Sequence, residues 1–424
     1  MPELFVLILM LLVFVLAVFL GKFPIGVSLA LSAIIAALAG GYGFPLRHLV
    51  EGSFAYLDPI LIIASAMVFM EIIKETGALN EISRLIIIYL HHKPFWMLAL
   101  ITLFIMFPGM ITGLSTAAVL TTGAIVAPAM MQLGIPRVKT GSIIAMAALY
   151  GMVAPPINVP AMIIGGGVDM PYIGFELPLL IASLPLAIVS TVFLGYKHVR
   201  HIDIDSVSKK LPPSQLSRHG WRLFLPIFAL IIMMTATRVI PGKWTSLGMP
   251  LIFLLCSLLA YRSGAPFNYI RVSRKAIHDA MPVMGILVGI GMFIQVMSLT
   301  GVRGYLILNA VQLPSFWLYI GIMLSLPLFG AISSYGASYV LGVPFLLALL
   351  GRNEIVVASG LTLIASLGDL MPPTALAGIF AAQVVGESNY FKILKSCLPY
   401  AALTALYGIG MILLANVLAR FVIL

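Results

Sequence analysis

Long apolar runs follow one another along the chain, separated by short polar breaks. Many approach the ~20 residues that a helix needs to cross a bilayer. They cover residues 4–21, 24–40, 57–73, 95–112, 116–133, 141–168, 176–197, 222–240, 246–262, 277–298, 315–329, 334–350, 354–386 and 396–419. The pattern predicts an all-helical polytopic membrane protein.

The apolar runs 141–168 and 354–386 each contain a Pro-Pro pair, Pro155-Pro156 and Pro372-Pro373. Two consecutive prolines remove two backbone donors and forbid a continuous helix. We therefore expect a broken helix in each run.

Two pairs of runs are separated by too little chain to form two spans with a polar loop. Gly113-Leu114-Ser115 separates the first pair, and Gly330-Ala331-Ile332-Ser333 separates the second. We interpret them as re-entrant helical hairpins, at 95–133 and 315–350, whose tips are buried.

The chain repeats itself. Thr76-Gly77 is echoed by Thr300-Gly301, and five further landmarks recur at one offset of 217 residues. These are Gly113, Gly134, Gly151, Pro155 and Pro156, which match Gly330, Gly351, Gly368, Pro372 and Pro373. The repetition predicts duplicated units, 1–197 and 222–424, joined by a cytoplasmic linker at 198–221.

Each unit is predicted to hold five spans and one hairpin. An odd number of spans places the second unit upside down relative to the first. With the linker in the cytoplasm, eighteen of the 24 Lys and Arg residues fall inside and six outside. This asymmetry agrees with the positive-inside rule. The arrangement predicts both termini outside, a first hairpin open to the cytoplasm and a second open to the exterior.

The composition also indicates a protein embedded in a lipid bilayer, since 61% of residues are hydrophobic and 9% are charged. A soluble domain has roughly 25% charged residues. The net charge of +10 lies in the breaks between runs, so it does not indicate nucleic-acid binding. Cys256 and Cys397 lie inside apolar runs, which indicates neither a disulfide framework nor a thiolate metal site. We interpret residues 4–20 as a retained span rather than a signal peptide.

Inverted repeats with broken helices are typical of secondary transporters, whose sites lie near the midplane. Irregular backbone survives there only where it lines a cavity or binds something. The hairpin tips and the Pro-Pro breaks are therefore the candidate sites. Their free carbonyls and hydroxyls suit Na⁺, and half-helix N-termini suit an anion. The substrate-binding candidates are Thr112, Ser115, Thr116, Asn158, Ser334 and Thr374.

Asp369 lies beside the second Pro-Pro pair, at predicted membrane depth. An intramembrane carboxylate is costly and is a functional candidate by default. It could be a cation ligand, a proton carrier or a cap on the half-helix that begins near Thr374. The amphipathic segments 74–92 and 299–313 precede the hairpins, and we expect them to lie along the interface as arms bracing a mobile part.

The order of elements resembles the large membrane (DctM-like) subunit of tripartite ATP-independent periplasmic (TRAP) transporters, within the ion-transporter superfamily. Three features carry the resemblance across nearly the whole chain. They are Gly-Lys-Phe-Pro at 21–24, the first tip followed by Pro128 and Gly134, and Gly-x-x-x-Pro-Pro at 151–156 and 368–373.

The resemblance implies an elevator-type transporter in the bacterial or archaeal inner membrane. It implies no cofactor, Na⁺ as the coupling ion, a periplasmic binding protein and a small membrane subunit as partners, and a small carboxylate such as a dicarboxylate or sialic acid as cargo. The Na⁺ ligands that it implies are Gly113, Ser115, Gly151, Pro155, Gly330, Ser333, Gly368 and Thr374, to which the residues themselves add Asp369.

The sequence departs from the family at two places. The tip, usually Ser-Gly-Ser-Ala, reads Thr112-Gly113-Leu114-Ser115-Thr116, and residues 240–246 lack the usual acidic segment. A divergent member is indicated.

Other functions remain open. A stand-alone carboxylate or ion symporter or antiporter of the same superfamily would need no binding protein. An intramembrane enzyme would need a catalytic constellation, and only Asp369 is available at depth, without a plausible partner. A passive channel is disfavoured by paired dead-end hairpins.

Overall fold

The computed structural model describes residues 2–199, 214–239 and 247–422, and their regular elements are helices. Five of these helices are long and apolar enough to cross a membrane, and a sixth span results if α3 and α4, bent by 43°, are counted together. Several of the other apolar helices are shorter, at 10–17 residues. The chain is thus an all-helical protein with membrane-spanning helices.

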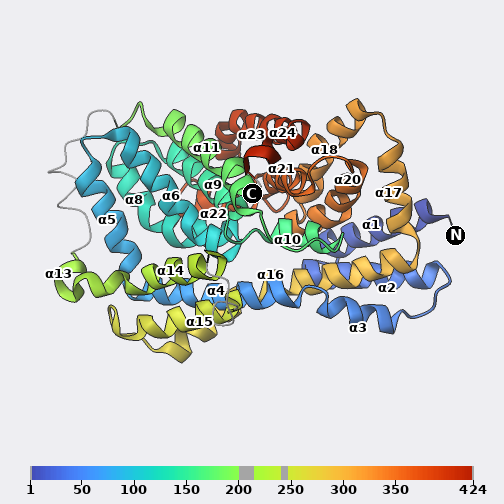
Figure 1. The fold of residues 1–424 in the computed structure, drawn as a ribbon, viewed down its shortest axis with the longest axis horizontal. Coiled ribbons are helices and arrows are strands. Elements are labelled where there is room, and N and C mark those ends of the chain that lie inside the picture. Colours follow the sequence, from blue (N-terminus) through green and yellow to red (C-terminus); the bar gives the residue numbers. More distant parts are fainter. Residues whose placement is uncertain (1, 200–213, 240–246, 423–424) are drawn as a thin grey trace.

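One layer of helices lies along one side of the molecule (Figure 1). We call it the scaffold layer. It contains α1 (Glu3–Phe19), α2 (Ile25–Ala39), α3 (Leu46–Phe54), α4 (Leu57–Glu75), α14 (Leu225–Val239), α15 (Met249–Leu259) and α16 (Tyr269–Leu299). The 31-residue α16 holds the layer together, because it packs against α2, α3 and α4.

Glycines allow α16 to approach its neighbours closely. A Cβ on Gly26 of α2 would lie 2.1 Å from the oxygen of Gly285, and one on Gly291 would lie 2.0 Å from the oxygen of Gly52 in α3. Small residues at helix crossings are the main way in which helices pack in lipid, where burying apolar surface adds little.

Two hairpins form the centre of the rest of the molecule, and they share one order of elements. The first consists of α6 (Pro94–Thr112), a tip, α7 (Ser115–Ala118), the π-helical turn η1 (Val119–Gly123) and α8 (Ala124–Gln132). The second consists of α18 (Ser315–Gly330), a tip, α19 (Ser334–Ala337), the π-helical turn η4 (Ser338–Gly342) and α20 (Val343–Ala348). In each hairpin the returning arm packs on the first one.

Both Pro-Pro pairs interrupt helices. The first lies between α9 (Arg137–Val153) and α10 (Val159–Gly166). The second lies between α21 (Glu354–Ser366), extended by the 3₁₀ turn η5 (Leu367–Leu370), and α22 (Leu376–Val385). Together with α11 (Glu176–Gly195), α23 (Tyr390–Leu413) and α24 (Ala415–Val422), the hairpins and broken helices form what we call the hairpin body.

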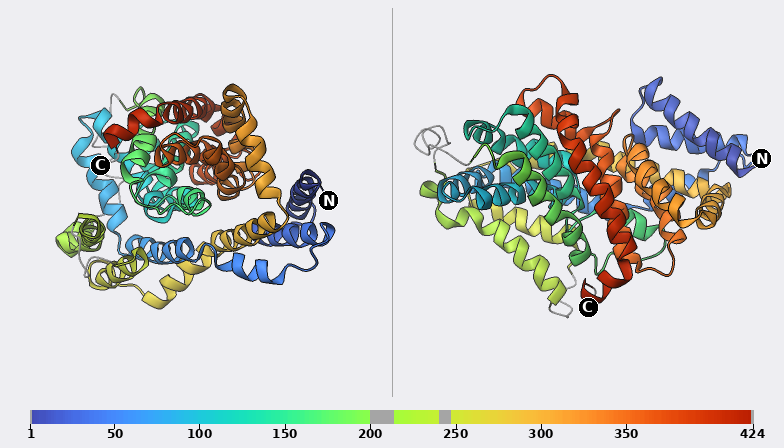
Figure 2. Two further views of the ribbon diagram at one scale, coloured as in Figure 1. Left: turned by 45° about the vertical axis from the view of Figure 1, so that its right-hand side comes forward. Right: turned by 90° about the horizontal axis from the view of Figure 1, so that it is seen from above.

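Two helices connect the scaffold layer to the hairpin body, one at each end (Figure 2). They are α5 (Ala78–Leu90) and α17 (Val302–Gln312), and each begins after a glycine with a left-handed backbone, Gly77 at φ 83° and Gly301 at φ 76°. Only glycine adopts this conformation without strain, so both Thr-Gly pairs mark sharp turns between long helices and arms.

The start of α5 is held by several contacts. The Glu81 carboxylate, 1% exposed, accepts hydrogen bonds from Ser214 Oγ at 2.9 Å and from the Gln215 amide at 2.7 Å. The amide of Ala265 also donates to the Thr76 carbonyl at 3.2 Å. The end of the linker is therefore anchored to the first arm.

Several boundaries differ from the sequence-based expectation. α9 begins at Arg137 and α16 at Tyr269, earlier than the apolar runs at 141 and 277, because polar residues continue both helices beyond their apolar parts. The run at 57–73 forms α4, and α3 precedes it at a bend of 43°. The linker at 198–221 lies mostly outside the described residues, which show α13 (Leu216–His219) and η2 (Gly220–Phe224) at its end. The segment 240–246 also lies outside them, and η3 (Ala260–Arg262) extends α15.

The scaffold crossing predicts unequal effects of two Gly→Ala substitutions within α16. Gly291→Ala places a methyl group against the Gly52 backbone, so we expect a loss of about 1–3 kcal/mol, the usual range for overpacking. Gly285→Ala is the matched control, since no atom lies within 4 Å of its added Cβ. Thermal unfolding of the purified variants measures the difference, and equal melting temperatures would contradict the close crossing.

Candidate functional site

A small buried cavity lies where the two hairpin tips meet the second Pro-Pro break. Its volume is about 50 Å³, enough for one ion or one water molecule, since a water occupies about 30 Å³ in the liquid. Its lining residues are Ile25, Leu114, Ser115, Thr116, Val283, Ile286, Gly330, Ile332, Ser333, Ser334, Tyr335, Asp369, Thr374 and Leu376. The structure therefore gathers residues from both halves of the chain around one point.

Asp369 is the only charged residue among those that line this cavity, and it is 4% exposed. Ser115 Oγ, at the first tip, donates a hydrogen bond to Asp369 Oδ2. Ser334, at the second tip, also lines the cavity beside this carboxylate. The first hairpin tip is thus hydrogen-bonded to the second break, beside the second tip.

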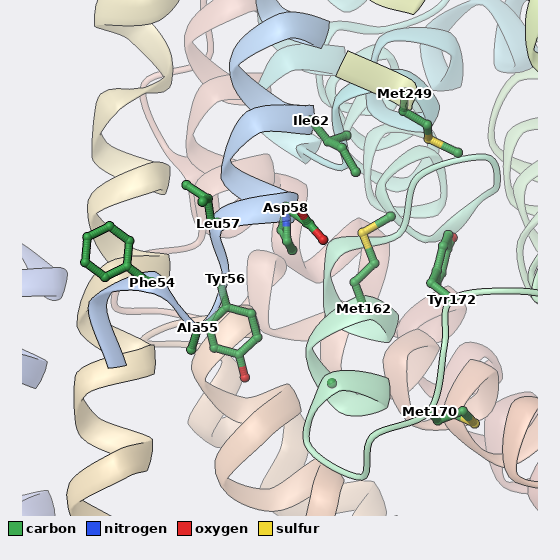
Figure 3. Close-up of a pocket in the computed structure, with 12 residues that line it drawn as sticks. Phe54, Ala55, Tyr56, Leu57, Asp58, Ile62, Met162, Met170, Tyr172 and Met249 are labelled. Carbon is green, nitrogen blue, oxygen red and sulfur yellow. The ribbon is translucent and has the colours of Figure 1, made fainter. Parts of the chain in front are cut away.

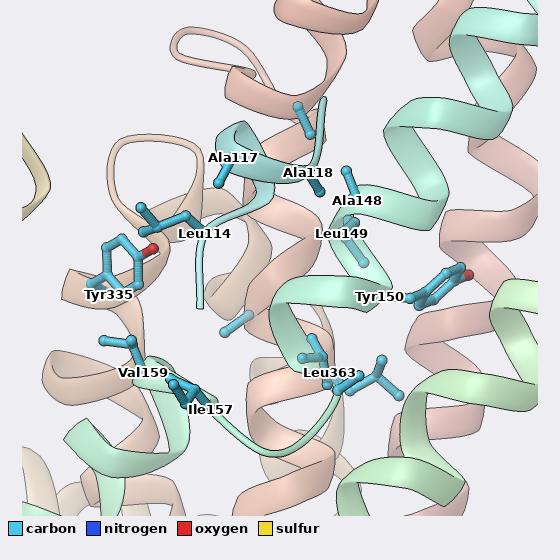
Figure 4. Packing of buried hydrophobic residues seen from close by; sticks show 14 of the residues in the cluster. Leu114, Ala117, Ala118, Ala148, Leu149, Tyr150, Ile157, Val159, Tyr335 and Leu363 are labelled. Carbon is cyan, nitrogen blue, oxygen red and sulfur yellow. The ribbon is translucent and has the colours of Figure 1, made fainter. Parts of the chain in front are cut away.

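A second contact joins the tips directly. Tyr335 Oη donates to the carbonyl of Gly113 at 3.0 Å, and both groups are buried. Gly113 ends α6 with φ 70°, which turns its carbonyl out of the helix and leaves it free to accept. Figure 4 shows the Tyr335 ring beside Leu114, the other residue of the first tip.

The second tip packs tightly on the second break. Thr374 Oγ1 donates to the Ala331 carbonyl at 2.7 Å, and a Cβ on Gly368 would lie 2.2 Å from the carbonyl carbon of Gly330. Ser333 Oγ accepts from the Gly336 amide at 3.1 Å and so caps the short helix α19. Its hydroxyl oxygen is engaged in that cap.

The first tip also faces its own break, but mainly through backbone. The amide of Ile157 donates to the Met110 carbonyl at 3.1 Å, and Thr112 Oγ1 donates to the Pro108 carbonyl at 2.7 Å. Asn158 caps α10, because its Oδ1 accepts from the Ala161 amide at 2.8 Å while its Nδ2 donates to the Val153 carbonyl at 2.9 Å.

The structure brings together some of the predicted site residues and leaves others apart. The cavity is lined by Ser115, Thr116, Gly330, Ser333, Ser334, Asp369 and Thr374. It is not lined by Thr112, Gly113, Gly151, Pro155, Asn158 and Gly368. Gly151 lies at a close helix contact, since a Cβ there would lie 2.6 Å from the Met106 carbonyl oxygen.

Sequence reasoning missed part of the lining. Ile25 of α2, with Val283 and Ile286 of α16, brings the scaffold layer to the cavity. These residues are apolar and lie in long apolar runs, so nothing in the sequence distinguishes them from their neighbours as cavity-lining residues. Tyr335 follows the second tip in the sequence, but only the fold shows that its hydroxyl reaches the other hairpin.

The two halves also cross each other. α10, which follows the first break, packs on η4 of the second hairpin, and α22, which follows the second break, packs on η1 of the first. Each broken helix thus contacts both hairpins.

A larger cavity of about 510 Å³ lies between the scaffold layer and the hairpin body. Figure 3 shows Tyr56 and Asp58, at the α3–α4 bend, across from Met162 of α10. Three methionines and the Phe54 ring make most of this space apolar. It separates two parts of the molecule that touch closely elsewhere.

Apolar spanning helices, paired hairpins and a buried polar site between broken helices define a polytopic membrane transport protein. Residues 11–417 match the family described as "Tripartite ATP-independent periplasmic transporter, DctM component". The chain belongs to this family. Its members form a component of TRAP-type secondary transporters, and it is not an enzyme family.

No curated protein matches the chain. Among solved structures, it is similar to the crystal structure of the Alcanivorax borkumensis YdaH transporter, described as having an unusual topology. The TM-score is 0.60 at 16% sequence identity, over 89% of each chain. At this identity the likeness concerns the fold alone.

The link between the tips predicts that Tyr335→Phe destabilises the protein. The substitution keeps the ring but leaves the buried Gly113 carbonyl without its donor, which costs about 1–3 kcal/mol. Tyr319→Phe is the control, because the contact of that ring with Arg352 does not need the hydroxyl. Thermal unfolding in detergent compares the two, and equal melting temperatures would argue against the bond.

Proposed function

We propose that this chain is the Na⁺-coupled membrane subunit of a system for uptake of a small carboxylate, working by an elevator mechanism. A periplasmic binding protein delivers the substrate, and a small membrane subunit braces the scaffold layer. The proposal places the chain in the plasma membrane with both termini outside and the two halves inverted.

The observation that carries the proposal is the small polar cavity shared by the two tips. Its hydroxyls and its carboxylate are hard oxygen ligands of the kind that alkali and alkaline-earth cations prefer. At about 50 Å³ it accommodates an ion but no dicarboxylate. Substrate therefore needs the tips to separate, which is the gating that paired hairpins allow.

The two-part architecture supports an elevator. The arms α5 and α17 join the scaffold layer to the hairpin body at opposite ends, and both begin at left-handed glycines (Figure 1). The apolar cavity of about 510 Å³ lies along the boundary between the two parts. A rigid body held by two arms moves with little rearrangement of its own packing.

Uptake into proteoliposomes tests the proposal. A panel of labelled carboxylates is offered with and without a Na⁺ gradient, and with and without a candidate binding protein. We expect uptake only when both are present. Uptake with the gradient alone would favour the stand-alone transporter, and uptake that ignores Na⁺ would refute the coupling.

Substitutions at the tips separate coupling from folding. Ser115→Ala and Ser333→Ala should raise the Na⁺ concentration needed for half-maximal uptake more than they lower the yield of folded protein. A parallel loss of folded protein and uptake would instead indicate that these serines only support packing.

An elevator mechanism requires the hairpin body to move relative to the scaffold layer. A covalent link between them should therefore stop transport. A Cβ on Gly166 of α10 would lie 4.0 Å from the Tyr56 ring in the scaffold layer, so cysteines at both positions should react with a short thiol cross-linker. We expect cross-linking to abolish uptake and each single cysteine to be unaffected by the reagent. Unchanged uptake after complete cross-linking would refute a relative movement at this boundary.

A further inference from the structure

We propose that Arg303 is a positioning residue of the transport cycle, which latches the second arm to the end of α10. Its guanidinium donates a hydrogen bond to the Gly167 carbonyl and lies 5.9 Å from the centroid of the Tyr339 ring. The latch holds the hairpin body against the scaffold layer in the arrangement that the structure shows. The inference rests on the elevator movement of the proposed function and names a contact that this movement has to break.

The chemistry of the contact suits a reversible bond. Gly167 is the C-cap of α10, and the last carbonyls of a helix lack helical partners and carry partial negative charge. The face of the Tyr339 ring attracts the same cation. Among the described residues, no carboxylate forms an ion pair with Arg303. Both partners are neutral, so opening the latch separates no ion pair.

The two partners belong to one rigid part of the molecule. A Cβ on Gly167 would lie 2.4 Å from Val343 Cγ2 and 3.0 Å from the Tyr339 ring, and α10 packs on η4. α10 comes from the first half of the chain, whereas Tyr339 lies in the second hairpin. Arg303 therefore contacts the hairpin body at a point where its two halves are packed together.

Arg303 itself lies beside a pivot. It follows the left-handed Gly301 by two residues, and α17 contacts α1 and α16 of the scaffold layer. A side chain next to a pivot is displaced little when the arm swings, while the hairpin body shifts as a unit. The bond to Gly167 therefore cannot persist when the body moves past the scaffold layer. The adjacent Gly166 meets that layer at the same place, since its Cβ would lie 4.0 Å from the Tyr56 ring.

The two arms differ at this position. When Thr76-Gly77 is aligned with Thr300-Gly301, Arg303 corresponds to Leu79, a fully buried apolar residue. The first arm makes its charged contact through Glu81, which binds the end of the linker and not the hairpin body. The latch is thus a property of the second arm.

Arg352 offers a control with the same chemistry. Its guanidinium also lies 5.9 Å from the centroid of a tyrosine ring, that of Tyr319, and donates to the Ile412 carbonyl in the last turn of α23 at 3.0 Å. Arg352 follows α20, Tyr319 is in α18, and all three elements belong to the hairpin body. This contact therefore stays within one part, whereas the Arg303 contact joins the arm to the body.

The test measures how often the end of α10 lies against the scaffold layer. Gly166→Cys and Tyr56→Cys are combined in the full-length protein, and the initial rate of their reaction with a short thiol cross-linker is followed without substrate. Adding Arg303→Gln should lower this rate severalfold. Tyr339→Leu should also lower it, because the substitution removes the ring face. Arg303→Lys should lower it less, because an ammonium can still donate to the carbonyl.

Arg352→Gln should leave the cross-linking rate at the wild-type value. Both Arg→Gln variants lose a bond to a helix-end carbonyl and a ring contact, so their melting temperatures should fall by similar amounts. A purely structural role of Arg303 would lower the melting temperature without changing the rate. If Arg303→Gln cannot be purified, Arg303→Lys and Tyr339→Leu decide the question.

Wild-type cross-linking rates in the Arg303 and Tyr339 variants would overturn the latch, as would an equal fall in Arg352→Gln. Failure of the proposed function is distinguishable, because the cross-linking assay requires neither Na⁺ nor a substrate. Wild-type uptake that ignores a Na⁺ gradient would refute the coupling and leave the result on Arg303 intact.

Discussion

Backbone and carboxylate groups that leave regular helices inside a bilayer must find partners within the protein, and the rest of this structure follows from that requirement. Lipid offers no hydrogen bonds, so each break in a helix needs acceptors and donors nearby. Here the polar groups at the helix breaks and at the hairpin tips hydrogen-bond to one another. The Gly113 carbonyl accepts a hydrogen bond from Tyr335, the Ala331 carbonyl accepts one from Thr374, and the Asp369 carboxylate accepts one from Ser115. The tips are therefore held by exchangeable polar bonds rather than by apolar packing alone.

The scaffold layer is held mainly by close helix packing. Its helices cross through glycines, at distances where any side chain would collide with backbone. Such contacts depend on shape and do not exchange partners. The molecule thus combines a layer held by close helix crossings with a body whose hairpin tips are also joined by a few polar bonds.

The helices and their breaks could be predicted from the sequence because both depend on local features. These are the length of each apolar run and the inability of a Pro-Pro pair to continue a helix. Helices, tips and breaks fall where Gly113, Gly330 and the Pro-Pro pairs indicated them. The pairing of side chains could not be predicted in this way. Ser115 was assigned to its own half, yet its hydroxyl reaches Asp369 in the other, because the tips meet across the repeat. Thr112 and Asn158 are predicted substrate ligands, and in the structure their side chains hydrogen-bond to local backbone groups. The hydrophobic periodicity of a helix predicts which face a residue occupies. It does not predict which distant element packs on that face.

The anchoring of the linker bears on how the chain could be divided. Ser214 and Gln215, which hold Glu81 at the base of the first arm, lie next to the second half in sequence. A chain cut before residue 214 would keep this anchor on its C-terminal fragment. Two separately expressed fragments would then each carry one side of this contact, Glu81 on one and Ser214 with Gln215 on the other.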